Sequence, residues 1–358
     1  MAGRAARLPF SRLTPARKTV LTQPIVKTVS LGVSLAIVVV LAGCSSTSST
    51  ASTVQLRLGY LTRITHATAL VGITDGLFTA QLGPRVNLSV QPFSQGTEEV
   101  TALLSGQLDA AYVGPNPAFN GWQKSGGKAI KIISGAASGG TSLVVKPGIT
   151  GAADLRGKTV ADPALGGNQD VSLRDWLARN GLKTNLQGGG DVSVKPTSPE
   201  SAIVEQFRTG QIAGALDSAP FDVQILKAGA VRLWSDPSTI TVLVVRQDFL
   251  AAHPDMVTAL LRANVQANDR IATEPEAAAR SANTALTKTL GKGLDPDVLA
   301  ASFQETTFTN DPGMASLHEL VAKAVTLGLL QPLDINGLFD PGPLNGVLAA
   351  TGKPQVAA

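Results

Sequence analysis

The chain has 358 residues, 44% of them hydrophobic and 16% charged, and a length that corresponds to about two or three domains of ordinary size. A single cysteine excludes an intramolecular disulfide framework, and three scattered histidines, His66, His253 and His318, argue against a metal centre. Aromatic residues make up only 4% of the chain, which disfavours a nucleic-acid stacking surface. We therefore expect no metal, no cofactor and no nucleic acid as partners.

The first 43 residues carry the basic excess of the chain. They contain six of the 30 Lys and Arg residues and no Asp or Glu, so 24 basic and 26 acidic side chains remain beyond them, a formal charge of −2. An apolar stretch of 14 residues, 29–42, follows these charges. It is shorter than the ~20 residues that span a bilayer and is typical of a signal-peptide core. We predict a lipoprotein signal peptide over residues 1–43.

Cys44 directly follows this apolar stretch. The run Leu41-Ala42-Gly43-Cys44 resembles the bacterial lipobox, in which the cysteine is diacylated and becomes the new N-terminus. Residues 44–53 form the predicted tether, because 45–53 are all Ser, Thr or Ala. Two acyl chains hold a protein firmly on a bilayer. We predict lipidation of Cys44 and a mature chain anchored on the outer face of the cytoplasmic membrane; an incidental thiol is the alternative.

From residue 54 onward, expected strands alternate with expected helices. Apolar and polar side chains alternate over residues 54–60, which indicates a strand, and a helix follows from about residue 68. Further strands are expected at 86–90, 108–113, 130–133 and 143–145, with helices at 97–105 and from residue 117. This alternation predicts an α/β fold with mostly parallel sheets.

The second half continues the pattern and ends in helices. A strand is expected after residue 158, then a helix over 168–180 that Gly181 closes. Ser198 and Pro199 are typical of an N-cap and a first helical position. Later helices are expected over residues 254–273, 275–290, 295–302 and 312–327.

A weak internal repeat relates two parts of the chain. Residues 102–111 align with residues 206–215 at a constant offset of 104, and both read as a helix end, a Gly-Gln turn and a strand of small residues. The first strand leads into residues 114–117 and the second into residues 217–220. The repeat predicts two similar lobes that face each other across a cleft.

An ordered series of short motifs resembles a known family. In chain order the motifs are Gly59-Tyr60, Gly76-Leu77-Phe78, Gly106-Gln107-Leu108-Asp109-Ala110 with Tyr112-Val113-Gly114, Asp154-Leu155-Arg156-Gly157-Lys158, Gly210 with Pro220-Phe221, and Phe249 with His253-Pro254-Asp255. Over residues 54–285 this order is similar to that of the substrate-binding proteins of bacterial ABC importers for sulfonates, nitrate and taurine. Their fold also covers a thiamine-precursor-binding family.

The resemblance implies a two-lobed, periplasmic-binding-protein-like α/β fold in which two hinge strands join the sheets. Hinges near residues 141–145 and 240–245 give a first lobe of residues 54–141 plus 246–358 and a second lobe of residues 146–239. The resemblance also implies a monomeric receptor that captures a small polar ligand, foremost an aliphatic sulfonate or related oxyanion. An ABC permease and ATPase are the implied partners. A thiamine precursor or another nitrogenous molecule is the alternative ligand.

One departure from the family pattern concerns the strand at residues 212–217. The family often carries an Asp after the glycine of this strand and an aromatic residue soon after, whereas here Gly214 is followed by Ala215-Leu216-Asp217. Asp217 therefore places an acid near the expected pocket. Because an ionised carboxylate repels an anion, the charge of the ligand depends on whether Asp217 and Glu98 face the cleft.

Ligand contacts are expected in the loops after the strands, because parallel α/β folds bind ligands at the carboxyl ends of strands, close to helix N-termini. The candidates are hydroxyl, amide, glycine, histidine and acidic residues: Thr65, His66, Ser94, Gln95, Gly114, Asn116, Ser138, Gly139, Thr141, Gly167, Asn168, Gln169, Asp217 and Ser218. Arg63, Gly96 and Pro117 lie in the same loops. Turn formation, helix capping and a solvated histidine are the simpler roles for the first-lobe candidates.

An enzyme on the same fold is the competing class. A thiolate nucleophile is excluded because Cys44 lies on the predicted tether. The sequence contains no Gly-x-Ser-x-Gly elbow and no Gly-x-x-x-x-Gly-Lys-Ser/Thr phosphate loop. We therefore predict a binding protein without catalysis; a surface scaffold without a ligand is a third interpretation.

Overall fold

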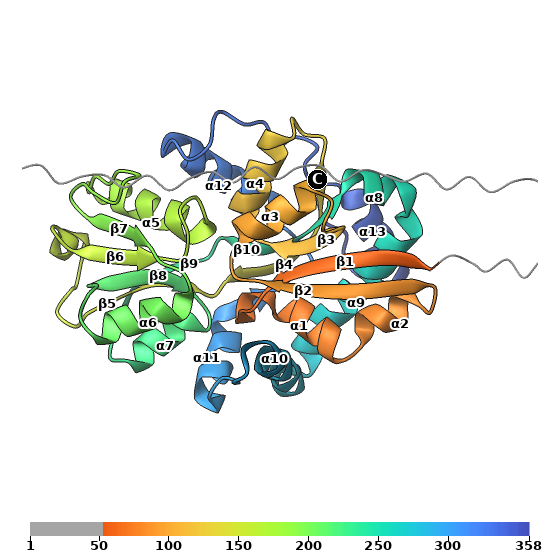
Figure 1. Ribbon diagram of the computed structural model, residues 1–358, viewed down its shortest axis with the longest axis horizontal. Helices are drawn as coiled ribbons and strands as arrows, with labels where there is room; N and C mark the ends of the chain where they lie inside the picture. Colours follow the sequence, from red (N-terminus) through yellow and green to blue (C-terminus); the bar gives the residue numbers. More distant parts are fainter. Residues whose placement is uncertain (1–52, 358) are drawn as a thin grey trace, which may run out of the picture. The chain divides into compact units, whose positions relative to one another are not determined.

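The structure is a computed structural model that describes residues 53–357 (Figure 1). The predicted signal peptide, Cys44 and most of the predicted tether lie outside the described residues. Two β-sheets organise the described part, and helices lie on both faces of each sheet (Figure 1). Among the helices of residues 53–357, none has the length and apolar character needed to cross a membrane.

The first sheet has six strands in the order β11-β4-β10-β3-β1-β2. Its strands are β1 (Val54–Leu61), β2 (Val86–Phe93), β3 (Ala110–Val113), β4 (Ile130–Gly139), β10 (Thr239–Arg246) and β11 (Thr306–Phe308). β1 runs parallel to β2 and to β3, whereas β10 runs antiparallel to β3 and β4.

The second sheet has five strands in the order β7-β6-β8-β5-β9. Its strands are β5 (Thr141–Val145), β6 (Thr159–Asp162), β7 (Ser193–Pro196), β8 (Gly214–Ser218) and β9 (Val231–Asp236). β6 runs parallel to β7 and β8, and β5 runs antiparallel to β8 and β9. The α/β fold class is confirmed. The sheets are mixed rather than mostly parallel, however. β5 and β10 are the first strands after the chain passes from one sheet to the other, and they run antiparallel to their neighbours β8 and β3.

The chain passes between the sheets twice. β4 leads into β5 through Gly140, and β9 leads into β10 through residues 237–238. The segments in which the sequence placed hinges are β5 itself and most of β10, so the crossings lie just before them. We call residues 53–139 together with 239–357 the first lobe, and residues 141–236 the second lobe.

Helices complete both lobes. In the first lobe they are α1 (Ala67–Thr74), α2 (Leu77–Leu82), α3 (Gly96–Leu104), α4 (Pro115–Lys124), α8 (Gln247–Ala252), α9 (Pro254–Thr273), α10 (Pro275–Leu290), α11 (Pro296–Glu305), α12 (Met314–Thr326) and α13 (Pro341–Ala350), with the 3-10 turn η1 (Ile64–His66). In the second lobe they are α5 (Asn168–Arg179), α6 (Glu200–Arg208) and α7 (Phe221–Lys227), with η2 (Ala152–Leu155).

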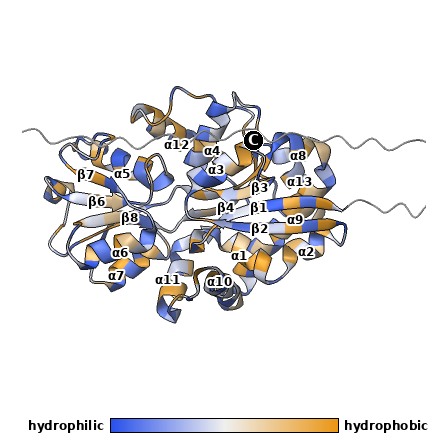
Figure 2. Cartoon of the chain, in the orientation of Figure 1, coloured by the Kyte–Doolittle hydropathy of each residue, from blue (hydrophilic) through white to orange (hydrophobic). Residues whose placement is uncertain are grey.

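Each sheet separates two hydrophobic clusters. Side chains of β3 alternate between them: Ala110 and Tyr112 pack against one cluster of the first lobe, and Ala111 and Val113 against the other. The period of two residues along a strand explains this alternation. Helices and strands accordingly mix hydrophobic and hydrophilic residues along their length (Figure 2). Two smaller clusters lie on the two faces of the second sheet.

The internal repeat is present in the structure. α3 and α6 begin and end 104 residues apart, at 96 and 104 in the first lobe and at 200 and 208 in the second. Both are followed by a glycine with positive φ, 74° at Gly106 and 75° at Gly210, which is a backbone conformation that only glycine adopts readily. The strands after them, β3 and β8, occupy the same place in their sheets, beside β1 and β6.

Two helix starts differ from the sequence expectation. α4 begins at Pro115 rather than at residue 117, because Gly114 is extended and forms the N-cap, and a proline at the first position forgoes no helical hydrogen bond. α6 begins at Glu200, since Pro199 is itself extended and is the N-cap in place of Ser198. The second difference places an acidic residue at the first position of α6.

Candidate functional site

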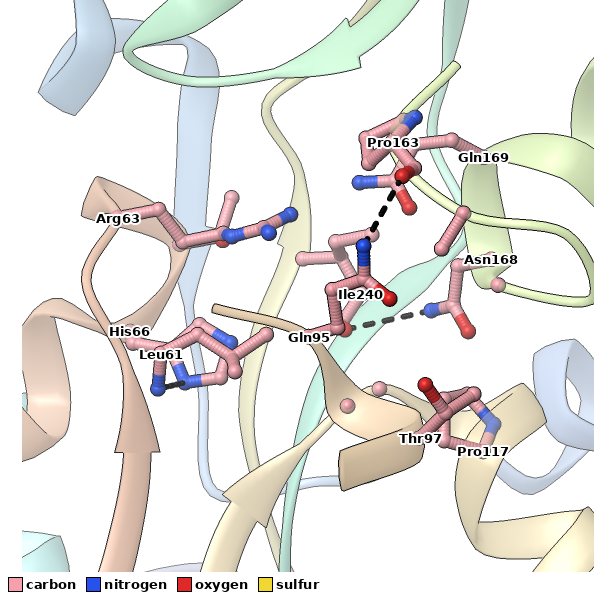
Figure 3. Close-up of a pocket in the computed structure, with 15 residues that line it drawn as sticks. Leu61, Arg63, His66, Gln95, Thr97, Pro117, Pro163, Asn168, Gln169 and Ile240 are labelled. Atoms are coloured by element: carbon pink, nitrogen blue, oxygen red, sulfur yellow. Dashed lines mark hydrogen bonds between the residues drawn. The ribbon is translucent and has the colours of Figure 1, made fainter. Parts of the chain in front are cut away.

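A small cavity lies between the two lobes, where several helices begin (Figure 3). Its volume is about 40 Å³, room for about three water molecules at 10–15 Å³ each. Its lining residues are Leu61, Arg63, Thr65, His66, Gln95, Gly96, Thr97, Gly114 and Pro117 from the ends of first-lobe strands and the helices after them, Pro163, Ala164, Gly167, Asn168 and Gln169 from the second lobe, and Ile240 at the start of β10.

The strand order brings these loops together. β1 lies between β2 and β3 and runs parallel to both, so the carboxyl ends of all three strands meet at one edge of the first sheet. In the second lobe the loop after β6 leads directly into α5. α3 and α5 thus present their first turns to the cavity from opposite lobes, and the first N–H groups of a helix have no partner within it.

Asn168, at the start of α5 in the second lobe, contacts the first lobe at two points. Its Oδ1 accepts a hydrogen bond from the backbone N–H of Asn116 at 2.9 Å, and its Nδ2 donates to the backbone oxygen of Ile240 at 3.3 Å. Gln95 Nε2 donates to the backbone oxygen of Pro163 at 3.4 Å, again across the lobes (Figure 3). These contacts hold the lobes close together around the small cavity.

Arg63 is the only charged residue among the fifteen that line the cavity, apart from the titratable His66. Its guanidinium extends from the loop after β1 toward the second lobe (Figure 3), where it forms an ion pair with Glu200. Both side chains are more than nine-tenths buried. No Asp or Glu is among the lining residues, so the wall of the cavity offers donors and one cation, but no carboxylate.

His66 is buried beside Arg63. Burial, reinforced by the positive charge of Arg63, lowers the pKa of His66 well below its ordinary value and keeps the imidazole neutral. Its Nδ1 accepts a hydrogen bond from the backbone N–H of Leu61 at 3.2 Å. In its neutral form the ring therefore carries its proton on Nε2 and is a hydrogen-bond donor there.

The acidic residues near the cavity do not face it. Asp217 is fully buried in β8, and burial together with Glu200 raises its pKa well above the ordinary value. Burial likewise raises the pKa of Glu99 well above its ordinary value, while Glu98 is exposed to solvent. Both buried acids favour the neutral form, so the repulsion of an anion that Asp217 suggested in the sequence is weakened. Within residues 53–357 no group of three or more potential metal-ligating side chains comes together.

The structure brings half of the sequence-predicted site residues to the cavity wall. These are Thr65, His66, Gln95, Gly114, Gly167, Asn168 and Gln169. The side chain of Thr65 is fully buried, and its hydroxyl has no hydrogen-bond partner among the described residues. The amide of Gln169 donates to the hydroxyl of Ser218 at 2.7 Å, which places it at the junction of α5 and β8.

The other seven candidates lie behind or beside the cavity. Ser138 and Gly139 belong to β4 and pair with β10 and β11, and the Thr141 and Ser218 hydroxyls form a 2.8 Å hydrogen bond to each other. The remaining three are Ser94, which is exposed, and Asn116 and Asp217, which are buried. Their roles as ligand contacts stay predictions.

Sequence reasoning missed several lining residues and one neighbour. The missed lining residues are Leu61, Thr97, Pro163, Ala164 and Ile240, most of which offer apolar side chains or backbone only. The missed neighbour is Glu200, the partner of Arg63. The internal repeat could have found it, because the offset of 104 aligns Glu200 with Gly96, which lines the cavity in the first lobe.

Two α/β lobes around a small cavity, with helix N-termini directed into it, match the fold of the periplasmic binding proteins. The chain belongs to the NMT1-like family, whose model matches residues 49–286. The family resemblance in the sequence is thereby confirmed.

Known relatives share parts of the sequence and most of the fold. The taurine-binding periplasmic protein of Escherichia coli K12 is 28% identical over 215 residues, 58% of this chain and 64% of that protein, so the match leaves about a third of the relative uncovered. The alkanesulfonate-binding protein SsuA from Xanthomonas axonopodis pv. citri, solved with MOPS, has a TM-score of 0.66 at 18% identity and covers 81% of this chain and 99% of its own. The nitrate-binding protein NrtA from Synechocystis PCC 6803 has a TM-score of 0.70 at 17% identity, with 85% and 90% covered. These two structures support the fold.

Proposed function

We propose that this protein is the extracytoplasmic solute-binding component of an ABC importer. It captures a small oxyanion, foremost an aliphatic sulfonate, between its two lobes and delivers it to a permease and an ATPase. It does so as a monomer and without catalysis. The family membership and the names of similar proteins, which are binding proteins for taurine, alkanesulfonates and nitrate, support this role.

The charge of the cavity wall is the observation that carries the proposal. α3 and α5 direct their N-termini to the cavity from opposite lobes, and helix N-termini favour anions through their free N–H groups and the helix dipole. The wall adds the guanidinium of Arg63 and the hydroxyls of Thr65 and Thr97, and it contains no carboxylate. A small anion with several oxygen acceptors matches this set of donors.

A thermal-shift panel tests the function. The panel contains alkanesulfonates, taurine, nitrate, aromatic sulfonates, pyrimidines and small amines. A ligand that binds only the folded protein stabilises it by about 2.7 kcal/mol at 100 times its Kd, so a fitting oxyanion should raise the melting temperature measurably. A shift with pyrimidines or amines and with no oxyanion would replace the sulfonate by a nitrogenous ligand, whereas no shift at all would favour a scaffold.

The lipid anchor has its own test. We propose that Cys44 is diacylated and holds the mature chain on the outer face of the cytoplasmic membrane, so Cys44→Ser is expected to release the protein into the soluble fraction. Membrane and soluble fractions of expressing bacteria are compared by immunoblot, with Ser45→Ala as the matched control beside the lipidation site. A Cys44→Ser protein that is still processed and stays on washed membranes contradicts the anchor.

Asn168→Ala tests the position of the site. The substitution removes the acceptor of the Asn116 N–H and the donor to Ile240, and a ligand bound beside them loses a partner as well. We expect affinity to fall by about 1–3 kcal/mol, measured by isothermal titration calorimetry with the best ligand of the panel. Asn180→Ala makes the same change at the exposed far end of α5 and should bind like the wild type. Equal affinity of all three proteins would move the site elsewhere.

A further inference from the structure

The ion pair between Arg63 and Glu200 joins the two lobes beside the cavity. Arg63 belongs to the loop after β1, and Glu200 begins α6 in the second lobe. The exposed fractions of the two side chains are 7% and 9%. Removing one partner of a buried ion pair leaves the other charge unpaired, which is strongly unfavourable. Arg63 thus needs an anionic partner at this place, and in this structure its own chain supplies one.

The position of Glu200 follows from the internal repeat. α6 of the second lobe corresponds to α3 of the first, and Glu200 corresponds to Gly96, which lines the cavity at the start of α3. A carboxylate in the first turn of a helix is stabilised by the helix dipole. In the first lobe, α3 begins at the cavity with a glycine, which brings no charge. In the second lobe, the corresponding helix α6 begins with the carboxylate of Glu200.

The ion pair also lies close to two cavities. Arg63 lines the inner cavity already described, whereas its neighbour in sequence, Thr62, lines a larger cavity of about 430 Å³, which we call the outer cavity. Ser201, next to Glu200, lines the outer cavity too. A hydrogen bond of 3.1 Å from the backbone N–H of Ile64 to the backbone oxygen of Ala219 crosses the lobes beside the pair. Along the chain, the pair and this hydrogen bond therefore lie next to lining residues of both the inner and the outer cavity.

The outer cavity can receive a charged solute. Helices of both lobes enclose it, α6 and α7 on one side and α10 and α11 on the other. Its lining includes three basic residues, Arg208, Lys227 and Lys292, against two acidic ones, Glu205 and Asp295. An anion in this space lies beside Thr62 and Ser201, the sequence neighbours of Arg63 and Glu200.

We propose that Glu200 is a built-in competitor for the anionic group of the solute. A solute that enters from the outer cavity displaces the Glu200 carboxylate from Arg63, and the guanidinium then binds the solute at the inner cavity. The planar guanidinium fork binds two oxygens of a carboxylate or a similar oxyanion at once, so the exchange selects solutes with at least two acceptor oxygens on one anionic group. This inference rests on the proposed function and adds a determinant of affinity to it.

Glu200→Gln is the decisive variant. Glutamine keeps the size of the side chain and an oxygen acceptor but removes the charge that competes with the solute. We expect Glu200→Gln to bind the best oxyanion of the panel about tenfold more tightly than the wild type, a difference of about 1.4 kcal/mol. Titration calorimetry measures the affinity, and circular dichroism checks the fold.

Glu276→Gln is the matched control. Glu276 lies in α10, its side chain is 93% exposed, and it lines neither the inner nor the outer cavity. The same loss of one negative charge there should leave the affinity within about twofold of the wild type, since exposed charges are largely screened by solvent and salt. An equal gain in both variants would show a general charge effect and overturn the competition.

A second variant protects the test against a folding defect. Glu200→Asp keeps the charge but shortens the side chain, so its contact with Arg63 weakens, and we expect a gain in affinity smaller than that of Glu200→Gln. Unchanged or weaker binding in both Glu200 variants, with oxyanion binding by the wild type intact, overturns the inference and leaves the proposed function standing. Absence of oxyanion binding by the wild type and by Glu200→Gln alike overturns the proposed ligand itself.

Discussion

Gly114→Val is expected to lower the affinity for the solute by about 100-fold, or about 2.7 kcal/mol, with little loss of stability. A Cβ atom at Gly114 would lie 3.0 Å from Oδ1 and 3.2 Å from Cγ of Asn168 in the opposite lobe. The two γ-methyl groups of valine need still more room, and overfilling a well-packed site typically costs about 1–3 kcal/mol. The valine therefore displaces Asn168 and holds the lobes apart where the solute is enclosed.

The backbone of Gly114 does not oppose this substitution. Its φ of −67° and ψ of 146° are extended values that a β-branched residue adopts without strain, so the effect comes from the space between the lobes. Gly151→Val is the matched control, because Gly151 is also extended and nothing lies within 4 Å of the added Cβ. Calorimetric titration of both variants measures the affinities. Wild-type affinity in Gly114→Val would show that the solute does not require these lobe contacts.

Gly135→Ala is expected to destabilise the folded protein by about 3 kcal/mol. Gly135 lies in β4, and a Cβ atom there would meet the backbone of the segment that follows β11, 2.4 Å from the oxygen and 2.5 Å from the carbonyl carbon of Asp311. Backbone atoms cannot turn aside as the end of a side chain can. The segment is also held in place, because the Gly135 N–H donates to the oxygen of Asn310 at 2.7 Å.

Gly346→Ala is the matched control, and we expect it to raise the stability of the folded protein slightly instead of lowering it. Gly346 is an exposed residue within α13, and nothing lies within 4 Å of its added Cβ. Alanine is the better helix former by about 1 kcal/mol, so this variant should be slightly more stable than the wild type. Urea denaturation followed by circular dichroism compares the three proteins. Equal midpoints for Gly135→Ala and the wild type would mean that the segment at 310–312 can move away at little cost.

The sequence predicted the fold well because its signals are local. Alternation of apolar side chains indicated β1, and a glycine stop indicated the end of the helix that became α5. The offset of 104 residues, read from only ten aligned positions, proved to relate α3 to α6 at both of their ends. The expectation of mostly parallel sheets was less accurate, because β5 and β10 run antiparallel to their neighbours. Their direction depends on how the chain crosses between the lobes and not on the pattern within either strand.

The site was predicted in part. Loops after strands contributed Thr65, Gln95, Gly114 and Asn168 to the cavity wall, as the geometry of α/β sheets requires. The carboxylates were harder to interpret, since their proximity to a loop says nothing of their surroundings. Asp217 follows a predicted strand and suggested an acidic wall, yet it is buried within the second lobe.

The sequence by itself determined the order of strands and helices, the two related lobes and the polar loops at the strand ends, because periodicity, capping and turns depend on residues close together in the chain. Only the tertiary structure decided the charge of the site. Arg63 and Glu200 are 137 residues apart and meet only when the lobes pack together. The raised pKa of Asp217 depends likewise on burial and on Glu200, which no local pattern records.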